Sequence, residues 1–427
     1  MQPDDREILD CVRSQKAYVS DIFDELRDGS SDTVGITRDT FGEGEQFGYQ
    51  VIEQRARAMD LALDWDHGAN LYMHLRGQRP ALPRIMFGSH LDSVRRGGNF
   101  DGAAGVVAGL VAQRTLKVLG ITPQCDVTTM AIRAEESVWF QVSYIGSRTA
   151  FGLLPDGALE ARRVDTGRTL AEHMSACGAD VDQVRAGKRW LDPATIRAFV
   201  EVHIEQAPQL IEAGLPVAIG TGVPGNFRYP DIHIEGTYAH VGLPRRFRND
   251  AALAGSDFAL GLDEIWQAND AAGRAMAFTI GRFHTNADEH GLTIVPGEMS
   301  LSLDVRAYDE SHLRELENQV KALVDRIERE RGVQFALGQR TSANVAPSDP
   351  GLVDGLTRTA GRLQIAAMPL ASPASHDAAT FAAAGVPTAM LFVRNENGSH
   401  NPHEAMEIDD FLDAAAVMTG WLVQEVS

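Results

Sequence analysis

Arg84-Ile85-Met86-Phe87-Gly88-Ser89-His90 is a short apolar run that ends on a histidine. A glycine-rich turn that contains Asp101 follows, and an apolar helical pattern then covers 103–119. A second apolar run at 126–133 and a helical pattern at 144–153 continue the alternation. Strands that alternate with helices are typical of βαβ units and of a parallel sheet. This stretch therefore predicts an α/β fold with a mixed, largely parallel sheet.

The alternation extends to both sides of that stretch. On the N-terminal side, the pattern predicts helices at 3–27 and 45–60 and short strands within 61–76. A polar segment at 155–198 leads to a strand at 199–204. After about 342 the alternation resumes, with a helix at 350–363, a segment at Ala378–Ala384, a strand at 387–393 and a closing helix at 409–425.

A different order lies between 222 and 341. We expect a strand at 228–237, a helix at 250–268, strands at 275–284 and 297–307, a helix at 310–331 and a strand at 333–340. This is βαββαβ, the order of a ferredoxin-like unit. Asp309 is the expected N-cap of the second helix, which keeps helical spacing on one face through Leu313, Leu316, Val320, Leu323, Val324 and Ile327. The simplest architecture is a discontinuous α/β domain, residues 1–221 and 342–427, with a smaller α+β domain, residues 222–341, inserted.

Composition excludes several classes of protein. A chain of 427 residues is too long for one core, so we expect about two or three domains. The net charge of −20 argues against nucleic acid and anionic membranes as partners. No stretch approaches the roughly 20 apolar residues of a membrane-spanning helix, and the polar N-terminus predicts no secretory signal. Three isolated cysteines, Cys11, Cys125 and Cys177, fit a reducing cytoplasm.

Three histidines and two acids follow the ends of the expected strands: His90, Asp101, Glu136, His203 and His400. In an open parallel sheet, sites form outside the carboxyl ends of the strands. Imidazoles are good ligands for divalent metals, and two ions about 3.5–4 Å apart need one shared ligand. Asp101 is the natural bridge, because the glycines around it let the backbone bring its carboxylate inward. The sequence therefore predicts two divalent metal ions, with Zn as the default and Mn, Co or Ni as alternatives.

Two more acids belong to the predicted site. Asp92 lies two residues after His90, where its carboxylate can accept the imidazole N–H. Glu135 precedes Glu136, and consecutive loop residues point in different directions. Glu135 is thus expected to face the substrate as a general base for a water molecule that a metal makes more acidic.

These motifs resemble the M20 metallopeptidase clan, and within it the group of N-carbamoyl-L-amino-acid hydrolases, allantoate amidohydrolases and β-ureidopropionases. The resemblance runs in order from about residue 40 onward. A histidine as the fourth ligand, in His203-Ile204-Glu205-Gln206, is typical of the carbamoylase side of the clan, since its peptidases and deacylases usually have Asp or Glu there. The other matching strings are 88–93, 97–103, Glu135-Glu136, 236–242, 295–297, 304–306, 375–378 and 399–402.

The resemblance implies a discontinuous, phosphorylase/hydrolase-like catalytic domain with an inserted domain that serves as lid and dimer interface. One metal is then held by His90, Asp101 and His203. The other is held by Asp101, Glu136 and His400. Glu135 acts as general base and acid. The implied assembly is a homodimer through the inserted domain.

The resemblance also implies the residues that contact the substrate. Gln206 lies where the family contacts substrate. His240 is similar to the histidine that reaches into the partner's site of a dimer and polarises the scissile carbonyl. Arg306 is similar to the arginine that binds the substrate carboxylate, a use that suits a planar bidentate donor. The alternatives are a surface role for His240, a structural ion pair for Arg306 and a simple turn for Asp92.

Four departures from the family pattern bear on the substrate. Trp139 follows the Glu pair where the family has smaller residues, and it either reshapes the pocket wall or packs. Ala207 replaces a usual glycine. Thr293 stands where the family has Asn, and Asn286 is the candidate to substitute for it. Arg394 adds a cation before His400.

The sequence therefore predicts a metal-dependent hydrolase of linear amides. The expected substrate is a small carboxylate-bearing amide, an N-carbamoyl amino acid, cleaved to the amino acid, CO2 and ammonia. Allantoate hydrolysis, deacylation of N-acyl amino acids and dipeptide cleavage are the alternatives, and His203 argues mildly against the last two. A non-catalytic binding protein would have lost a ligand or the base. A dehydrogenase is not indicated, because no GxGxxG follows the strand at 84–88.

Overall fold

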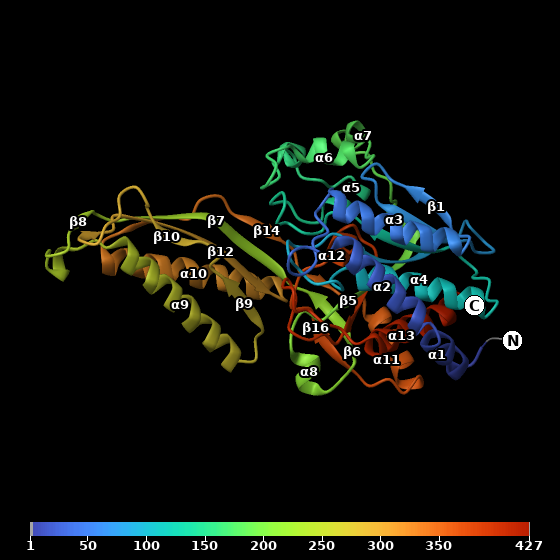
Figure 1. The fold of residues 1–427 in the computed structure, drawn as a ribbon. Coiled ribbons are helices and arrows are strands. Elements are labelled where there is room, and N and C mark those ends of the chain that lie inside the picture. The colour runs from blue at the N-terminus through green and yellow to red at the C-terminus, as the bar shows by residue number, and fades with distance from the viewer. Residues whose placement is uncertain (1–2, 427) are drawn as a thin grey trace. The chain divides into compact units, whose positions relative to one another are not determined.

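The computed structural model describes residues 3–426. The chain forms two compact units: Met1–Val223 together with Pro347–Ser427, and Pro224–Ala346. For comparison, the sequence pattern changes at 222 and 341. Figure 1 shows the elements in chain order by colour.

The first unit is built on a mixed sheet with the strand order β1-β2-β4-β3-β5-β17-β6-β15 and with β16 beside β6. The four central strands β4, β3, β5 and β17 run parallel to one another, and β2 and β6 pair with them antiparallel. The predicted α/β class with a mixed, largely parallel sheet is therefore confirmed. The strands are β1 (Ala62–Trp65), β2 (Leu71–Leu75), β3 (Arg84–His90), β4 (Val127–Ile132), β5 (Ile196–Ile204), β6 (Val217–Val223), β15 (Ala346–Pro347), β16 (Ala367–Ala371) and β17 (Thr388–Val393).

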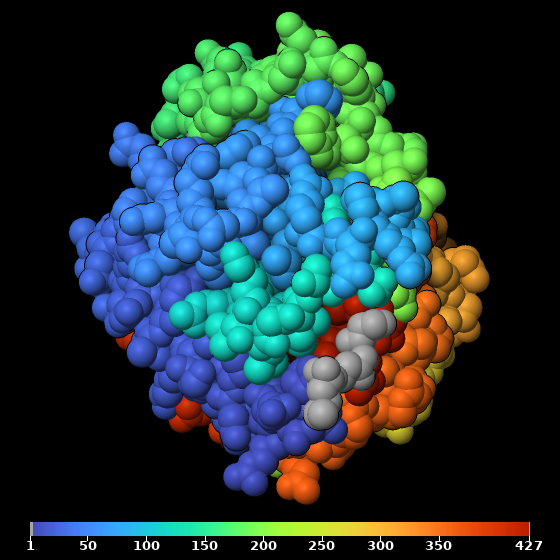
Figure 2. Space-filling view, turned by 90° about the vertical axis from the view of Figure 1, so that its right-hand side faces the viewer, coloured from blue at the N-terminus to red at the C-terminus, as the bar shows by residue number. Residues whose placement is uncertain are grey.

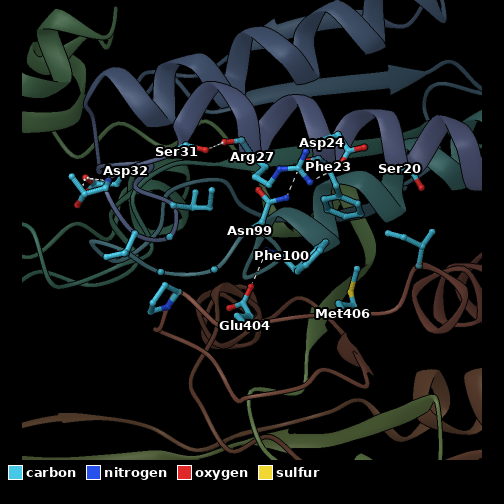
Figure 3. Close-up of a pocket in the computed structure, with 18 residues that line it drawn as sticks. Ser20, Phe23, Asp24, Arg27, Ser31, Asp32, Asn99, Phe100, Glu404 and Met406 are labelled. Atoms are coloured by element: carbon cyan, nitrogen blue, oxygen red, sulfur yellow. Dashed lines mark hydrogen bonds and ion pairs between the residues drawn. The ribbon is translucent and has the colours of Figure 1, made fainter.

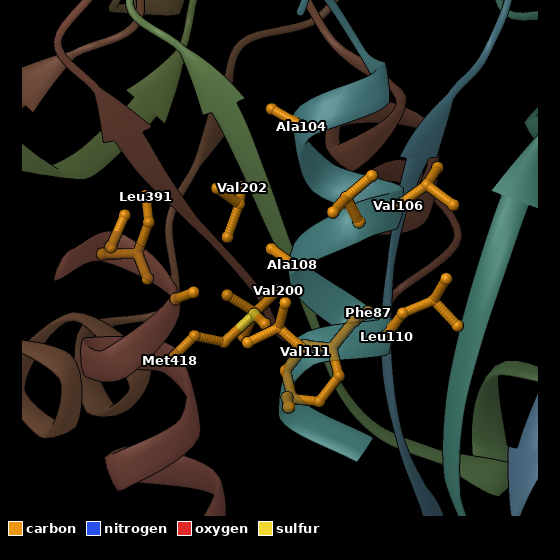
Figure 4. Packing of buried hydrophobic residues seen from close by; sticks show 14 of the residues in the cluster. Phe87, Ala104, Val106, Ala108, Leu110, Val111, Val200, Val202, Leu391 and Met418 are labelled. Carbon is orange, nitrogen blue, oxygen red and sulfur yellow. The ribbon is translucent and has the colours of Figure 1, made fainter. Parts of the chain in front are cut away.

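Helices pack on both faces of this sheet. Helices α4 and α13 contact the parallel strands on one face, where Val200 and Leu391 meet Val111 and Met418 in a continuous buried cluster (Figure 4). On the other face α12 contacts β5 and β17. The helices of this unit are α1 (Asp5–Arg13), α2 (Lys16–Ser30), α3 (Glu43–Ala58), α4 (Ala103–Val118), α5 (Ile145–Ala150), α6 (Leu170–Ala176), α7 (Val181–Arg185), α8 (Gln209–Ala213), α11 (Pro350–Arg362), α12 (Asp377–Ala383) and α13 (Ile408–Val426).

Successive side chains of each strand point to opposite faces of the sheet, because a strand is pleated. Val200 of β5 belongs to the buried cluster under α4 and α13. Its neighbour Phe199 stacks on Phe381 of α12, with ring centroids 3.7 Å apart. Because both faces are covered, the parallel strands are mostly apolar.

The N-terminal helix expected at 3–27 is two helices, α1 and α2. Ser14 ends the first one, and its hydroxyl donates a hydrogen bond of 2.7 Å to the Cys11 carbonyl. A serine side chain that bonds to the backbone competes with helix continuation. The view in Figure 2 looks onto these N-terminal segments, drawn in blue.

The second unit has a sheet of antiparallel strands in the order β10-β12-β7-β13, with β9 beside β12 and β14 beside β7. Helices α9 and α10 pack on it. The range expected as one strand at 275–284 is two short strands, β9 and β10. The elements are β7 (Gly225–Glu235), β8 (Ala239–His240), α9 (Ala251–Ala271), β9 (Met276–Thr279), β10 (Phe283–Thr285), β11 (Ile294–Val295), β12 (Glu298–Ala307), α10 (Glu310–Arg331), β13 (Gln334–Ala336) and β14 (Thr341–Ala343).

Within residues 3–426, no helix has both the length and the apolar content that a membrane crossing requires.

Candidate active site

The five predicted metal ligands lie together at the carboxyl ends of the parallel strands. His90 is the last residue of β3 and His203 lies at the end of β5. Within the described chain they form two groups whose potential ligand atoms lie within 4.8 Å of one another: His90, Asp101 and His203, and Asp101, Glu136 and His400. All are buried except His400, whose side chain is 52% exposed.

Asp101 belongs to both groups. Its Oδ1 lies 3.3 Å from Nε2 of His90 and 3.3 Å from Nε2 of His203. Its Oδ2 lies 3.6 Å from Nε2 of His400, which in turn is 3.3 Å from Oε1 of Glu136. Each oxygen of one carboxylate therefore faces a different pair of donors, as a bridging ligand must.

Hydrogen bonds fix the tautomers of the two buried histidines. Nδ1 of His90 lies 2.9 Å from the carbonyl oxygen of Asp92, and Nδ1 of His203 lies 2.9 Å from that of Ile204. A carbonyl oxygen only accepts, so both Nδ1 atoms carry the proton and donate it. In the neutral imidazole, Nε2 is then the nitrogen with the lone pair and faces Asp101, the arrangement of metal-binding imidazoles.

Gly102, between Asp101 and α4, allows this close packing. Its φ is +66°, and a Cβ atom there would lie 2.5 Å from the ring of His90. Any larger residue would collide with the imidazole and would be strained at that φ.

Asp92 acts differently from the sequence expectation in one respect. The atom that accepts from His90 is its backbone carbonyl, while its carboxylate Oδ1 lies 3.4 Å from Nδ1 of His90. The carboxylate instead accepts the backbone N–H groups of Glu135 and Glu136, at 3.0 and 3.2 Å, and the hydroxyl of Thr40. Asp92 therefore holds the backbone of the Glu pair.

Glu135 is half-buried and belongs to neither ligand group. Burial raises the pKa of its carboxyl group well above the usual range, and the carboxylates of Glu136 and Asp377 add to the effect against the attraction of His90. His400 shows the opposite balance: burial lowers its pKa, but the contact with Glu136 outweighs this and raises the pKa to about 9. The candidate site thus concentrates negative charge.

Gln206 follows β5 and reaches the shared acid. Its Nε2 donates a hydrogen bond of 2.8 Å to Oδ2 of Asp101. Its Oε1 is buried and makes no hydrogen bond among the described residues. The backbone of Gln206 has φ +63°, which is uncommon for a residue other than glycine. The segment is anchored by Asn395, whose Oδ1 accepts from the Gln206 N–H at 2.9 Å.

The other predicted substrate residues belong to the second unit. His240 is exposed on β8, and its Nδ1 accepts from the Gly242 N–H at 3.1 Å. Arg306 on β12 donates to Asp304 at 3.2 Å. Asn286 follows β10 and donates to Glu298 at 2.8 Å.

Packing in the first unit explains two of the four departures from the family pattern, Trp139 and Arg394. Trp139 is 3% exposed, donates its indole N–H to the Ser93 carbonyl and lies against the guanidinium groups of Arg95 and Arg163. Arg394 forms a double hydrogen bond with Asp410 of α13, at 2.8 and 3.1 Å. Arg394 is therefore neutralised by a fixed partner.

Several residues that support the site had no recognised signal in the sequence. Arg38 is fully buried and donates to the Leu91 and Asn99 carbonyls, one near each end of the loop between His90 and Asp101. Glu201 accepts from Ser89 and from the backbone of Ala378. Their partners lie 53 to 177 positions away, so no local pattern could reveal them.

The residues present fit a pair of divalent cations. Ligand atoms about 2.0–2.2 Å from a tetrahedral zinc ion lie about 3.3–3.6 Å from one another, and the separations around Asp101 are 3.3–3.6 Å. The donors are imidazole nitrogens and carboxylate oxygens. With Asp92, three buried acids (Asp92, Asp101 and Glu136) lie beside two buried histidines, and buried carboxylates cost free energy unless cations are present.

Comparisons with known proteins identify a matching family. The family model for peptidase family M20/M25/M40 matches residues 86–424. The chain is 30% identical to the N-carbamoyl-L-amino-acid amidohydrolase of Paenarthrobacter aurescens (95% of this chain, 97% of that protein) and 29% identical to the allantoate amidohydrolase of Escherichia coli strain K12 (93% and 94%).

Among solved structures, a hydantoinase/carbamoylase family amidase from Burkholderia ambifaria superposes with a TM-score of 0.81 at 28% identity. The match covers 96% of this chain and 98% of that one. The resemblance stated from the motifs is thereby confirmed, and the chain belongs to peptidase family M20/M25/M40.

Proposed function

We propose that this protein is a two-metal amidohydrolase that removes the carbamoyl group from an N-carbamoyl amino acid and releases the amino acid, CO2 and ammonia. The observation that carries the proposal is the carboxylate of Asp101, whose two oxygens face two separate donor groups. The relatives that act on carbamoyl and allantoate substrates support the reaction class.

The metals would be held by His90, Asp101 and His203 on one side and by Asp101, Glu136 and His400 on the other. Bound divalent cations supply Lewis acidity, which polarises a carbonyl and makes a water molecule more acidic. Zinc suits these donors, and manganese, cobalt or nickel are the alternatives.

Glu135 supplies the proton transfers. Its carboxylate accepts a proton from the attacking water and returns it to the nitrogen of the amino acid, so that the bond between this nitrogen and the carbamoyl carbon breaks. The amino acid departs with a neutral amine, and the carbamic acid that remains decomposes to CO2 and ammonia. Asp92 keeps the base in place through the backbone of Glu135.

Substrate recognition is proposed from four side chains. The unbonded Oε1 of Gln206 suits a ureido N–H, since a buried acceptor without a donor is costly. Arg306 suits the substrate carboxylate as a bidentate donor. His240 would polarise the scissile carbonyl, and Asn286 would add a polar contact.

A substrate panel tests the proposed activity. The metal-free protein is reloaded with Zn, Mn, Co or Ni and assayed with N-carbamoyl amino acids, allantoate, N-acetyl amino acids and dipeptides. We expect release of ammonia, and the highest kcat/KM, with an N-carbamoyl amino acid. The highest kcat/KM with allantoate would make the protein an allantoate amidohydrolase. Cleavage of acyl amino acids or dipeptides alone would contradict the proposal.

We also propose a homodimer formed through the second unit. Leu253 and Leu260 of α9, seven positions apart on one helix face, are 43% and 65% exposed. Contiguous exposed apolar patches mark interaction surfaces, and the two leucines are the candidate centre of such a patch. Light scattering is expected to give twice the mass of the 46.4 kDa chain, and Leu260→Glu is expected to shift it toward the monomer. A monomeric wild-type protein would contradict this.

A further inference from the structure

Glu404 lies at the border between the candidate metal ligands and a separate cavity. The cavity has a volume of 570 Å³ and is formed by α2, the loop 31–36, the loop 97–100 and the segment 402–408. In Figure 3, Glu404 lies below Phe100 and Asn99, and the dashed line joins Glu404 to Phe100. Glu404 itself is only 8% exposed.

The carboxylate of Glu404 accepts hydrogen bonds from two ligand-bearing loops. Oε1 accepts the backbone N–H groups of Phe100 and Asp101, at 2.9 and 3.2 Å. Oε2 accepts the hydroxyl of Ser399 at 2.7 Å. Asp101 and Ser399 lie in loops almost 300 positions apart in the chain. One side chain therefore joins the loop that carries the shared acid to the loop that carries His400.

The hydroxyl of Ser399 strengthens this connection. It also contacts Oδ2 of Asp101. A hydroxyl has one proton, so it donates to one carboxylate at a time. The two carboxylates within reach of this hydroxyl are Asp101 and Glu404. Only Glu404 lies outside both ligand groups, so it can still accept from Ser399 when Asp101 binds a metal.

The surrounding backbone leaves Glu404 little freedom. A Cβ atom at Gly98 would lie 2.1 Å from its carboxyl group, so only glycine permits the approach. His400 has φ +60°, a conformation that contacts around the loop must maintain. By contrast, His90 and His203 are held by the strands β3 and β5.

We propose that Glu404 is a positioning residue that sets the separation between Asp101 and His400. It thereby determines the affinity for the metal ion that Asp101, Glu136 and His400 would hold. This inference rests on the proposed two-metal function. Oε1 of Glu404 accepts both backbone N–H groups, and Oε2 accepts the Ser399 hydroxyl. A glutamine would place its NH2 group against Ser399, whose hydroxyl would then donate to Oδ2 of Asp101 and compete with the cation for that oxygen.

The test is calorimetric titration of Zn²⁺ into the metal-free protein, for the wild type and for Glu404→Gln. We expect two equivalents in the wild type. In the variant we expect the equivalent bound by Asp101, Glu136 and His400 to lose about 10–100-fold in affinity, so that one of the two affinities falls while the other changes less than about threefold. Asp126→Asn is the matched control, because Asp126 also accepts a backbone N–H (Gly77, 2.8 Å) but lies at the other end of β4. It should bind zinc like the wild type.

Two wild-type affinities in Glu404→Gln would overturn the inference and leave the proposed function standing. A wild-type protein that binds only one equivalent would contradict the two-metal proposal. In that case the zinc affinity of the single site is compared between the wild type and Glu404→Gln. An unchanged affinity would overturn the role of Glu404 as well. If Glu404→Gln fails to fold, as judged by thermal unfolding of the metal-free protein, Ser399→Ala removes only the hydroxyl. It should weaken the same equivalent by a smaller factor, and no change there would also count against the inference.

Discussion

Replacing Glu135 with glutamine is expected to lower kcat by about 10²–10⁴-fold, the contribution of a general base, without loss of bound metal. Glutamine keeps the size of the side chain and the backbone N–H that bonds to Asp92. It cannot take up a proton from water. Glu135 lies outside both ligand groups, so the donors for the cations remain. The measurements are kcat on the best substrate of the panel and elemental analysis of the purified protein.

The adjacent residue provides the control. Glu136→Gln makes the same chemical change one position along the chain, but Glu136 is a member of the group with Asp101 and His400. We expect this variant to lose metal as well as activity. A Glu135→Gln protein with normal turnover would remove Glu135 from the mechanism. Equal metal loss in both variants would show that the two side chains do not have separate roles.

Replacing Asp101 with asparagine is expected to reduce the metal content from two ions to at most one and to lower activity by about 10³-fold or more. A carboxamide offers one oxygen ligand, and its NH2 group cannot bind a cation. A metal that acts as a Lewis acid supplies several kcal/mol to the transition state, and each 1.4 kcal/mol is about tenfold in rate. Asp101 is the residue whose loss affects both groups at once.

Elemental analysis and kcat/KM on the same preparation check this prediction, with Asp126→Asn as the control for a change from Asp to Asn at a buried position. Two tightly bound ions in the Asp101→Asn protein would show that Asp101 is not the bridge. Full activity with one ion would show that a single cation suffices for the reaction.

Local sequence patterns predicted the elements whose signals are contained within them. Helix α10, Glu310–Arg331, begins and ends where its pattern indicated. Its N-cap Asp309 accepts from the His312 N–H, and Gly332 ends it in a left-handed conformation. The parallel strands β3, β4, β5 and β17 were likewise visible as apolar runs, because strands that are buried on both faces contain few polar residues.

Local patterns did not reveal elements that depend on distant partners. Strand β16 exists through its pairing with β6, about 150 positions earlier. The break between α1 and α2 depends on Ser14, whose type alone does not state whether its hydroxyl will bond to the backbone. A strand that owes its stability to a neighbour carries little signal of its own.

For the candidate site too, local sequence patterns revealed some features, and others depend on contacts between distant residues. The sequence alone determined the family, the α/β class and the chemical types at the strand ends, because motifs and strand periodicity are local in the chain. Only the tertiary structure decided that Asp92 bonds to the backbone of Glu135 and Glu136, that Arg394 is neutralised by Asp410, and that Glu404 joins two loops. Except for the bond from Ser399 to Glu404, these hydrogen bonds join residues 16 to 304 positions apart, and their geometry exists only after the strands have paired and the helices have packed.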